Sequence, residues 1–262
     1  MTEPNSGAVP LHHPLYRSVG NYGGDCFGIS LLMEVDADVV ARVLEPTPFD
    51  FVSAHAWVEA YVYPTTFGMA GYDDNAGPPY GSFGVVVPVR YGEHVGGYYA
   101  HCFKNKDYGI YPGREAAGFP IKQAELSMQR SGRVVSGTMT RPTARFDLSL
   151  VIDEPGRERA APVDVARTPN LLLQSIPSVE RDEVMLQQII RRDVLASSSL
   201  VTTSGEGAIS FLPTPSGIDE LDWLANGRVV HGEFFSGDFR GAHGQVVGAT
   251  ASAAFLSRLS SA

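Results

Sequence analysis

Residues 113–122 read GREAAGFPIK, and this segment decides the fold that we expect for the chain. A Gly-Arg-Glu triplet is followed, after two alanines and a glycine, by an aromatic residue, a proline, an isoleucine and a lysine. The glycine and proline content of residues 112–118 predicts a break in regular structure. Proline is well tolerated in the first turn of a helix, so residues 120–128 are predicted to form a helix or a short turn.

Three further segments have a distinctive order of residues. Residues 168–177 read TPNLLLQSIP, and residues 80–89 read YGSFGVVVPV. Leu44-Glu45-Pro46 follows a run with helical spacing.

The four segments resemble the acetoacetate decarboxylase superfamily. That family has Gly-Arg-Glu followed by an aromatic residue, a proline and two lysines, and a later Arg-Pro-Asn-Tyr-Met-Leu-Lys-Ile-Ile-Pro segment. Their order and separations agree from Pro10 to about Gly248. The resemblance implies an α+β fold that is mainly antiparallel β and barrel-like, with a few flanking helices. It also implies assembly as a homo-oligomer.

The resemblance further implies a chemistry, from which this chain departs. In the family the first lysine after the proline forms a Schiff base with a ketone, and the iminium accepts the electrons that remain when CO₂ leaves. Ile121 occupies that position here, and Lys122 occupies the place of the second lysine. Ser82 stands where the family has a glutamate, and Gly24 where it has an arginine suited to a substrate carboxylate. Ordinary acetoacetate decarboxylation is therefore not expected.

The residues that match the motifs, or flank the implied pocket, are the candidate site. Lys122 either enters the pocket and forms the Schiff base or is a solvated or salt-bridged lysine beside a pocket lined by Ile121. Arg114 and Glu115 either act on the substrate or form an ion pair that holds the loop. As catalytic residues we predict Lys122, Glu115 and Ser82; as substrate-binding residues we predict Arg114, Tyr80, Ile121, Tyr91 and His101.

The remaining pattern favours strands without reference to any family. Asp36 is a predicted N-cap for a helix over 36–44, and further helices are predicted at 218–224 and 246–259. Residues 170–176 and 184–190 suit either a strand or a helix, and 194–212 suits a strand pair. One domain over 1–262, with an extended arm at 1–24, is the expected organisation. Apolar or alternating runs of strand length lie at 26–35, 54–63, 82–91, 97–104, 133–140, 144–152 and 229–239.

Composition limits the partners. The formal net charge of -9 argues against nucleic acid and anionic membranes. No apolar run approaches the ~20 residues that span a bilayer, and the first ten residues do not resemble a signal peptide. Cys26 and Cys102 match no zinc or CxxC spacing and are expected to be buried thiols in the cytoplasm. The histidine spacing supports no metal site, and no cofactor is implied.

Three hypotheses of function follow. The first is an enzyme that acts on a ketone or polyketide-like carbonyl compound by aldol, dehydration or cyclisation chemistry, in secondary metabolism. The second is a lysine-independent cyclase or isomerase with a shaped apolar pocket. The third is a non-catalytic binding protein. Only three lysines occur in the chain, Lys104, Lys106 and Lys122, so amine chemistry by a side chain has few candidates.

Overall fold

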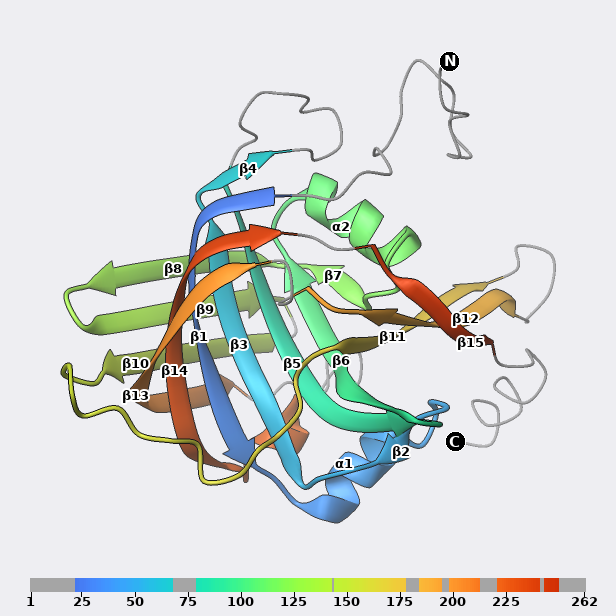
Figure 1. The fold of residues 1–262 in the computed structure, drawn as a ribbon, viewed down its shortest axis with the longest axis horizontal. Helices are drawn as coiled ribbons and strands as arrows, with labels where there is room; N and C mark the ends of the chain where they lie inside the picture. The colour runs from blue at the N-terminus through green and yellow to red at the C-terminus, as the bar shows by residue number, and fades with distance from the viewer. Residues whose placement is uncertain are drawn as a thin grey trace.

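The computed structural model describes residues 22–67, 79–142, 144–177, 184–194, 198–212, 221–240 and 243–249. Fifteen strands in these ranges join one sheet. The longest of them are strongly curved (Figure 1). They are β1 (Tyr22–Glu34), β2 (Asp50–Phe51), β3 (His55–Tyr63), β4 (Thr65–Phe67), β5 (Tyr80–Tyr91), β6 (His94–Lys104), β7 (Ile121–Gln123), β8 (Glu125–Ser131), β9 (Val134–Arg141), β10 (Ala144–Ile152), β11 (Asn170–Pro177), β12 (Val184–Arg192), β13 (Ser199–Leu212), β14 (Arg228–Arg240) and β15 (Gln245–Ala249).

The sheet has the strand order β15-β12-β11-β6-β5-β3-β1-β14-β13-β10-β9-β8, with β2, β4 and β7 beside this path. Among the described pairs, only β6–β7 and β6–β11 are parallel. The prediction of a mainly antiparallel α+β fold is therefore confirmed. The term barrel-like is too strong, because the strand path does not close between β15 and β8.

The sheet bends over itself and encloses the main core. Strands β8, β9 and β10 cross one face of β1, β3 and β5 (Figure 1). Successive side chains of a strand point to opposite faces, so Ile29, Leu31 and Met33 of β1 enter this core together. From the crossing strands come Met139 and Phe146, both almost fully buried.

The opposite face of the central strands is also buried. On β3, Trp57, Glu59 and Tyr61 alternate with residues that face the main core, such as Val58. A second hydrophobic cluster covers this face and includes Trp57 and Leu172. Burial on both faces explains why the central strands are apolar over long runs instead of alternating cleanly. The candidate site lies on this second face.

Two α-helices and one 3-10 turn accompany the described strands: α1 (Ala37–Leu44), α2 (Asp107–Glu115) and η1 (Asp222–Leu224). The Asp36 carboxylate accepts hydrogen bonds from the backbone N–H groups of Asp38 and Val39, at 2.9 and 3.2 Å, so the predicted N-cap is confirmed. Helix α2 overlaps the break predicted at 112–118. It extends through Pro112 and ends at Glu115.

Several other local predictions are corrected. Residues 120–128 form strands β7 and β8 because they pair with β6 and β9, not a helix. The two ambiguous segments are strands β11 and β12, and 194–212 holds one long strand, β13. Strand β15 occupies the start of the helix predicted at 246–259. The rest of that helix, residues 1–21 of the arm predicted at 1–24, and residues 213–220 lie outside the described residues, whereas residues 22–24 of that arm belong to β1.

No helix in the described part of the chain is long and apolar enough to cross a membrane.

Candidate active site

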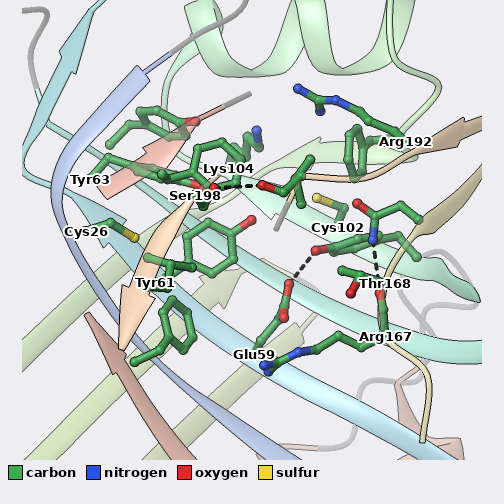
Figure 2. Close-up of a pocket in the computed structure, with 18 of the residues that line it drawn as sticks. Cys26, Glu59, Tyr61, Tyr63, Cys102, Lys104, Arg167, Thr168, Arg192 and Ser198 are labelled. Atoms are coloured by element: carbon green, nitrogen blue, oxygen red, sulfur yellow. Dashed lines mark hydrogen bonds between the residues drawn. The ribbon is translucent and has the colours of Figure 1, made fainter. Parts of the chain in front are cut away.

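A cavity of about 200 Å³ lies beneath α2, on the second face of the central strands (Figure 2). Its walls come from β1, β3, β5, β6, β13 and β14, and from the chain around β11 and β12. The lining residues are Cys26, Glu59, Tyr61, Tyr63, Tyr80, Tyr99, Cys102, Lys104, Phe119, Arg167, Thr168, Asn170, Arg192, Val194, Ser198, Leu200, Thr202, Phe235 and Phe239.

Lys104 is the last residue of β6, and its side chain runs under α2 into this cavity. Its Nζ atom lies 5.2 Å from the centroid of the Tyr80 ring. The helix has glycines where it passes over the lysine. A Cβ atom at Gly109 would lie 3.3 Å from Lys104 Cδ, and one at Gly113 would lie 3.9 Å from Nζ. The amine is thus held between the helix and an aromatic ring.

The environment of Lys104 shifts its protonation equilibrium towards the neutral amine. Burial lowers the pKa of this amine to about 8, and the positive charge of Arg192 acts in the same direction. At pH 7 an amine with this pKa is about 10% neutral, whereas an amine with the ordinary value is about 0.04% neutral. A neutral amine is the form that attacks a carbonyl carbon. Lys104 therefore has the property that a Schiff-base lysine requires.

Glu59 and Tyr99 form a polar pair in the wall of the cavity. The Tyr99 hydroxyl donates a hydrogen bond to Glu59 Oε1 at 2.5 Å, and both residues are buried. Burial raises the pKa of the Glu59 carboxyl, against the lowering effects of Arg167 and of the Tyr99 hydrogen bond. Burial also raises the pKa of Tyr99, so its hydroxyl keeps the proton. A carboxyl with a raised pKa is suited to exchange protons with a bound molecule near neutral pH.

Arg167 lies over a row of polar residues beside this pair. Ser30 pairs with Glu59 on one side and with Glu233 on the other, so the three side chains share one face of the sheet. Arg167 Nη1 donates to Ser30 Oγ at 2.8 Å, and Arg167 Nη2 lies 3.1 Å from Glu233 Oε2. The guanidinium also lies 4.9 Å from the Trp57 ring centroid. This paired arginine supplies positive charge next to Glu59.

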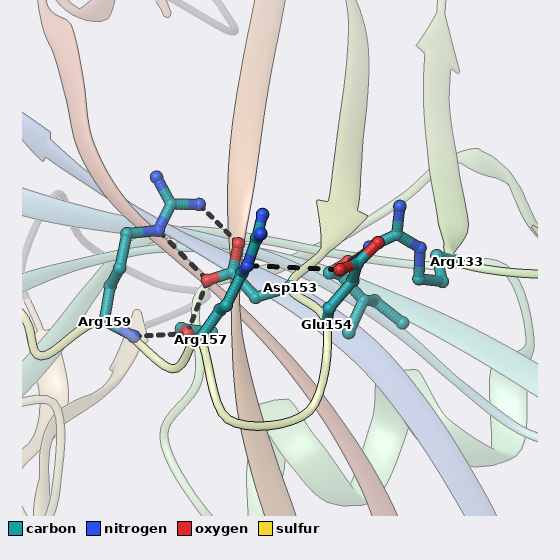
Figure 3. A network of polar contacts seen from close by, with 7 residues as sticks. Arg133, Asp153, Glu154, Arg157 and Arg159 are labelled. Carbon is teal, nitrogen blue, oxygen red and sulfur yellow. Dashed lines mark hydrogen bonds and ion pairs between the residues drawn. The ribbon is translucent and has the colours of Figure 1, made fainter.

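The segment that carries Arg167 is fixed at both ends. At its start, Asp153 accepts hydrogen bonds from Arg159 at 2.8 and 3.0 Å and from the Ser204 hydroxyl at 2.6 Å (Figure 3). Arg159 and Ser204 lower the pKa of the Asp153 carboxyl. At its end, the Gly97 N–H donates to Pro169 O at 2.9 Å. A Cβ at Gly97 would lie 2.3 Å from Arg167 O, so only glycine permits this close approach.

Arg192 is a second guanidinium that lines the cavity. It ends β12, pairs with Asn170 of β11, and lies 5.8 Å over the Phe119 ring. Burial lowers the pKa of Arg192, but an arginine remains charged at neutral pH. Its charge acts on Lys104 and makes this part of the cavity electropositive.

Three of the residues predicted from the sequence lie at or directly behind the cavity. Tyr80 lines it. Ser82 of β5 is buried. It pairs across the sheet with two cavity residues, Tyr61 of β3 and Lys104 of β6. Ile121 is 1% exposed and packs in the second hydrophobic cluster with Cys102. The site of the family motif is therefore next to the cavity.

Lys122 lies on the other face of its strand. In the parallel pair of β6 and β7, Ile121 is opposite Cys102, Lys122 is opposite Phe103, and Gln123 is opposite Lys104. Cys102 and Lys104 face the cavity, whereas Phe103 belongs to the main core. Because neighbours in a strand point in opposite directions, Lys122 points away from the cavity. It is not among the lining residues.

Arg114 and Glu115 hold the turn after α2 and do not line the cavity. Both side chains are exposed. Arg114 Nη1 donates to Ile121 O at 2.7 Å, and the Glu115 carbonyl accepts a hydrogen bond from the Gln174 side chain. Arg114 therefore joins the helix end to β7.

Tyr91 and His101 are not brought to the cavity. Tyr91 is at the far end of β5, where its ring contacts Phe49 edge-on at 6.4 Å. His101 accepts a hydrogen bond from Trp223 Nε1 at 3.2 Å. Their strands had suggested a site role. Strand β6, however, has an irregular register between Tyr99 and His101, so Tyr99 lines the cavity whereas His101 stacks with Phe103 of the main core.

Sequence reasoning did not select Lys104, Glu59, Arg167 or Arg192. Two signals were present in the sequence. Lys104 is one of only three lysines and ends an apolar strand, and Glu59 is a charged residue inside an aromatic and apolar strand. A charged group in such a position is unfavourable unless it is paired or functional.

The described residues hold no group of three His, Cys, Asp or Glu side chains that could bind a metal ion. Cys26 and Cys102 both line the cavity, but burial raises their thiol pKa values to about 12 and about 11. Among these three nucleophilic side chains of the described cavity, Lys104 is thus the one whose pKa is shifted towards the reactive, deprotonated form.

The sheet thus holds a buried amine, Lys104, and a buried carboxyl, Glu59, in the wall of one cavity. The family described as acetoacetate decarboxylase (ADC) matches residues 8–250, and the chain belongs to this family. No curated protein sequence matches the chain significantly.

Solved structures agree on the fold. The acetoacetate decarboxylase of Legionella pneumophila is 20% identical over 95% of this chain and 94% of that chain, with a TM-score of 0.77. An acetoacetate decarboxylase-like enzyme of Sphingomonas wittichii RW1 is 15% identical over 94% and 99%, with a TM-score of 0.77. The enduracididine biosynthesis enzyme MppR is 14% identical over 95% and 98%, with a TM-score of 0.73.

Proposed function

We propose that the chain is an enzyme that binds a small carbonyl compound in this cavity and activates it as a Schiff base on Lys104. The observation that carries the proposal is a cavity-facing amine whose pKa is lowered to about 8. The family motif had suggested Lys122 for this role, but that side chain lies on the face away from the cavity. Lys104 reaches the space beneath α2 from the neighbouring strand.

The first step forms a C–N bond. The neutral amine of Lys104 attacks the carbonyl carbon, the carbonyl oxygen takes up protons and leaves as water, and an iminium remains. The iminium withdraws electrons from the neighbouring carbon, so a proton on that carbon can be removed to give an enamine. Glu59, as a carboxylate held by the Tyr99 hydroxyl, is the group in the cavity wall that can accept this proton.

We propose that the enamine then reacts with a second carbonyl group, rather than forming by loss of CO₂. The enamine carbon attacks the second carbonyl carbon, a C–C bond forms, and the new oxygen is protonated. The carbon next to the iminium then loses a second proton, the new hydroxyl leaves as water, and a C=C bond forms. Hydrolysis of the iminium by another water molecule releases the dehydrated product and frees Lys104. If both carbonyls belong to one molecule, the product is a ring. Ile121 stands where the family motif has its first lysine, so the chain departs from the decarboxylase pattern. This departure is consistent with aldol, dehydration or cyclisation chemistry in secondary metabolism.

Two structures of one structural neighbour, MppR, are consistent with this proposal. MppR has been solved with pyruvate and with the condensation product of pyruvate and imidazole 4-carboxaldehyde. Those ligands are properties of MppR. They support the idea that this fold holds carbonyl compounds and condensation products.

The test is borohydride trapping with a panel of ketones and aldehydes, read by intact mass and peptide mapping. We expect a reduced adduct on Lys104 that is lost in Lys104→Met and kept in Lys122→Met, the matched control. No adduct with any carbonyl compound, together with measurable turnover in Lys104→Met, would favour a lysine-independent cyclase or isomerase. Binding without turnover of any candidate would favour a binding protein.

A further inference from the structure

The walls of the cavity are unusually aromatic. Seven of its 19 lining residues are Tyr or Phe, whereas aromatic residues make up 10% of the chain. They come from four different strands and from the segment after α2. The seven are Tyr61, Tyr63, Tyr80, Tyr99, Phe119, Phe235 and Phe239.

Five of these rings form a continuous group, which we call the aromatic wall: Tyr61, Tyr63, Tyr80, Phe235 and Phe239. Tyr63 is at its centre, with ring centroids 4.7 Å from Tyr80, 5.2 Å from Tyr61 and 5.3 Å from Phe239. The Tyr61 and Phe235 centroids are 6.0 Å apart. All five residues line the cavity.

The other two rings, Tyr99 and Phe119, belong to a different hydrophobic cluster from the aromatic wall. Their centroids are 5.0 Å apart, in an edge-on contact. The cavity is therefore bounded by rings from two separately packed groups. Lys104 lies next to the wall, because its Nζ is 5.2 Å from the Tyr80 centroid.

This arrangement favours a flat, π-rich ligand over a small aliphatic one. Aromatic rings attract one another in offset and edge-to-face contacts, beyond the effect of buried area. An apolar cavity of about 150 Å³ accommodates benzene, and this cavity is about 200 Å³. A two- or three-carbon substituent would leave much of the space unfilled. Burial also raises the pKa of Tyr61 and Tyr63, so their hydroxyls remain neutral hydrogen-bond donors.

We propose that the cavity takes an aryl or otherwise conjugated carbonyl compound, with its planar ring against the aromatic wall and its carbonyl carbon at Lys104. The position of the carbonyl rests on the proposed function. The recognition of the ring does not, because it depends on Tyr61, Tyr63 and Phe239 and involves no covalent step.

The test compares acetophenone with cyclohexyl methyl ketone, which has the same carbonyl on a saturated ring of similar size. Dissociation constants are measured by ligand-observed NMR titration in the wild-type protein and in Lys104→Met, where no Schiff base can form. We expect acetophenone to bind at least about 5-fold more tightly in both proteins, which corresponds to about 1 kcal/mol. In Tyr63→Leu and Phe239→Leu this preference falls towards 1, and in Tyr91→Leu, the control, it is kept.

Equal affinity for the two ketones, no saturable binding of either, or an unchanged preference in folded Tyr63→Leu and Phe239→Leu would overturn the proposal. Circular dichroism establishes whether each variant is folded. If Tyr63→Leu does not fold, Phe239→Leu alone tests the ring preference. Selective binding of acetophenone without any trapped adduct would refute the Schiff base and leave the aromatic subsite standing. A trapped adduct on Lys104 without any preference for acetophenone would support the Schiff base and refute the aromatic subsite.

Discussion

The lowered pKa of Lys104 makes a quantitative prediction about how its reactivity changes with pH. A neutral amine reacts with a small activated ester, and a protonated amine does not. With a pKa of about 8, the neutral fraction rises from about 0.1 at pH 7 to about 0.9 at pH 9, roughly tenfold, and then levels off. An amine with the ordinary pKa would gain about 100-fold over the same interval and continue to gain up to pH 10.

The assay is brief acylation at a series of pH values, followed by digestion and quantification of the peptide that contains Lys104. We expect the rate of acylation at Lys104 to have a midpoint near pH 8 and a plateau above pH 9. Lys104→Met removes the modified peptide and so establishes that the signal comes from Lys104. The reasoning is refuted if acylation at Lys104 rises about tenfold per pH unit through pH 10 without a plateau.

Three further outcomes are expected. Arg192→Gln removes a nearby positive charge that contributes to the low pKa of Lys104, so the midpoint of the acylation profile moves to higher pH; an unmoved or lower midpoint contradicts this. Lys104→Met removes a buried amine whose pKa is lower in the folded chain than in the unfolded one. The unfolded wild type therefore binds more protons than the folded protein between about pH 8 and pH 10.5, and wild-type stability rises with pH over this interval. Below pH 8 the variant is expected to be more stable by about 3 kcal/mol. Urea unfolding at pH 7 and pH 10 measures this difference in the free energy of unfolding, which should be smaller at pH 10. Glu59→Gln should still form the trapped adduct but turn over about 10²-fold or more slowly, because it lacks the proton acceptor; normal turnover excludes that role.

Much of the fold could be predicted because its signals are local. The N-cap at Asp36 and the alternating run of β3 are encoded within a few residues. Strand β7 could not be predicted in this way. Phe119-Pro120-Ile121-Lys122 is compatible with a helical turn, and only its parallel pairing with β6, which is distant in sequence, makes it a strand.

That single difference decides the site. Neighbours on a helix are about 100° apart, whereas neighbours on a strand point in opposite directions. With Ile121 directed to the cavity side, Lys122 must face away from it. The sequence indicated the correct turn and the shortage of lysines, but it did not show that the end of β6 passes under α2. That arrangement depends on contacts between distant parts of the chain. The same is true of the position of Arg167 over Ser30 and Glu233.

The chain contains only three lysines, so their protonation can be followed one by one. Protein labelled with ¹³C at the lysine ε carbons gives three resonances, which Lys104→Met and Lys122→Met assign. If Lys104 is the reactive amine of the cavity, its resonance titrates near pH 8 and shifts when a carbonyl ligand is added. A Lys104 resonance that titrates only above pH 10 and is unaffected by carbonyl ligands would contradict the account.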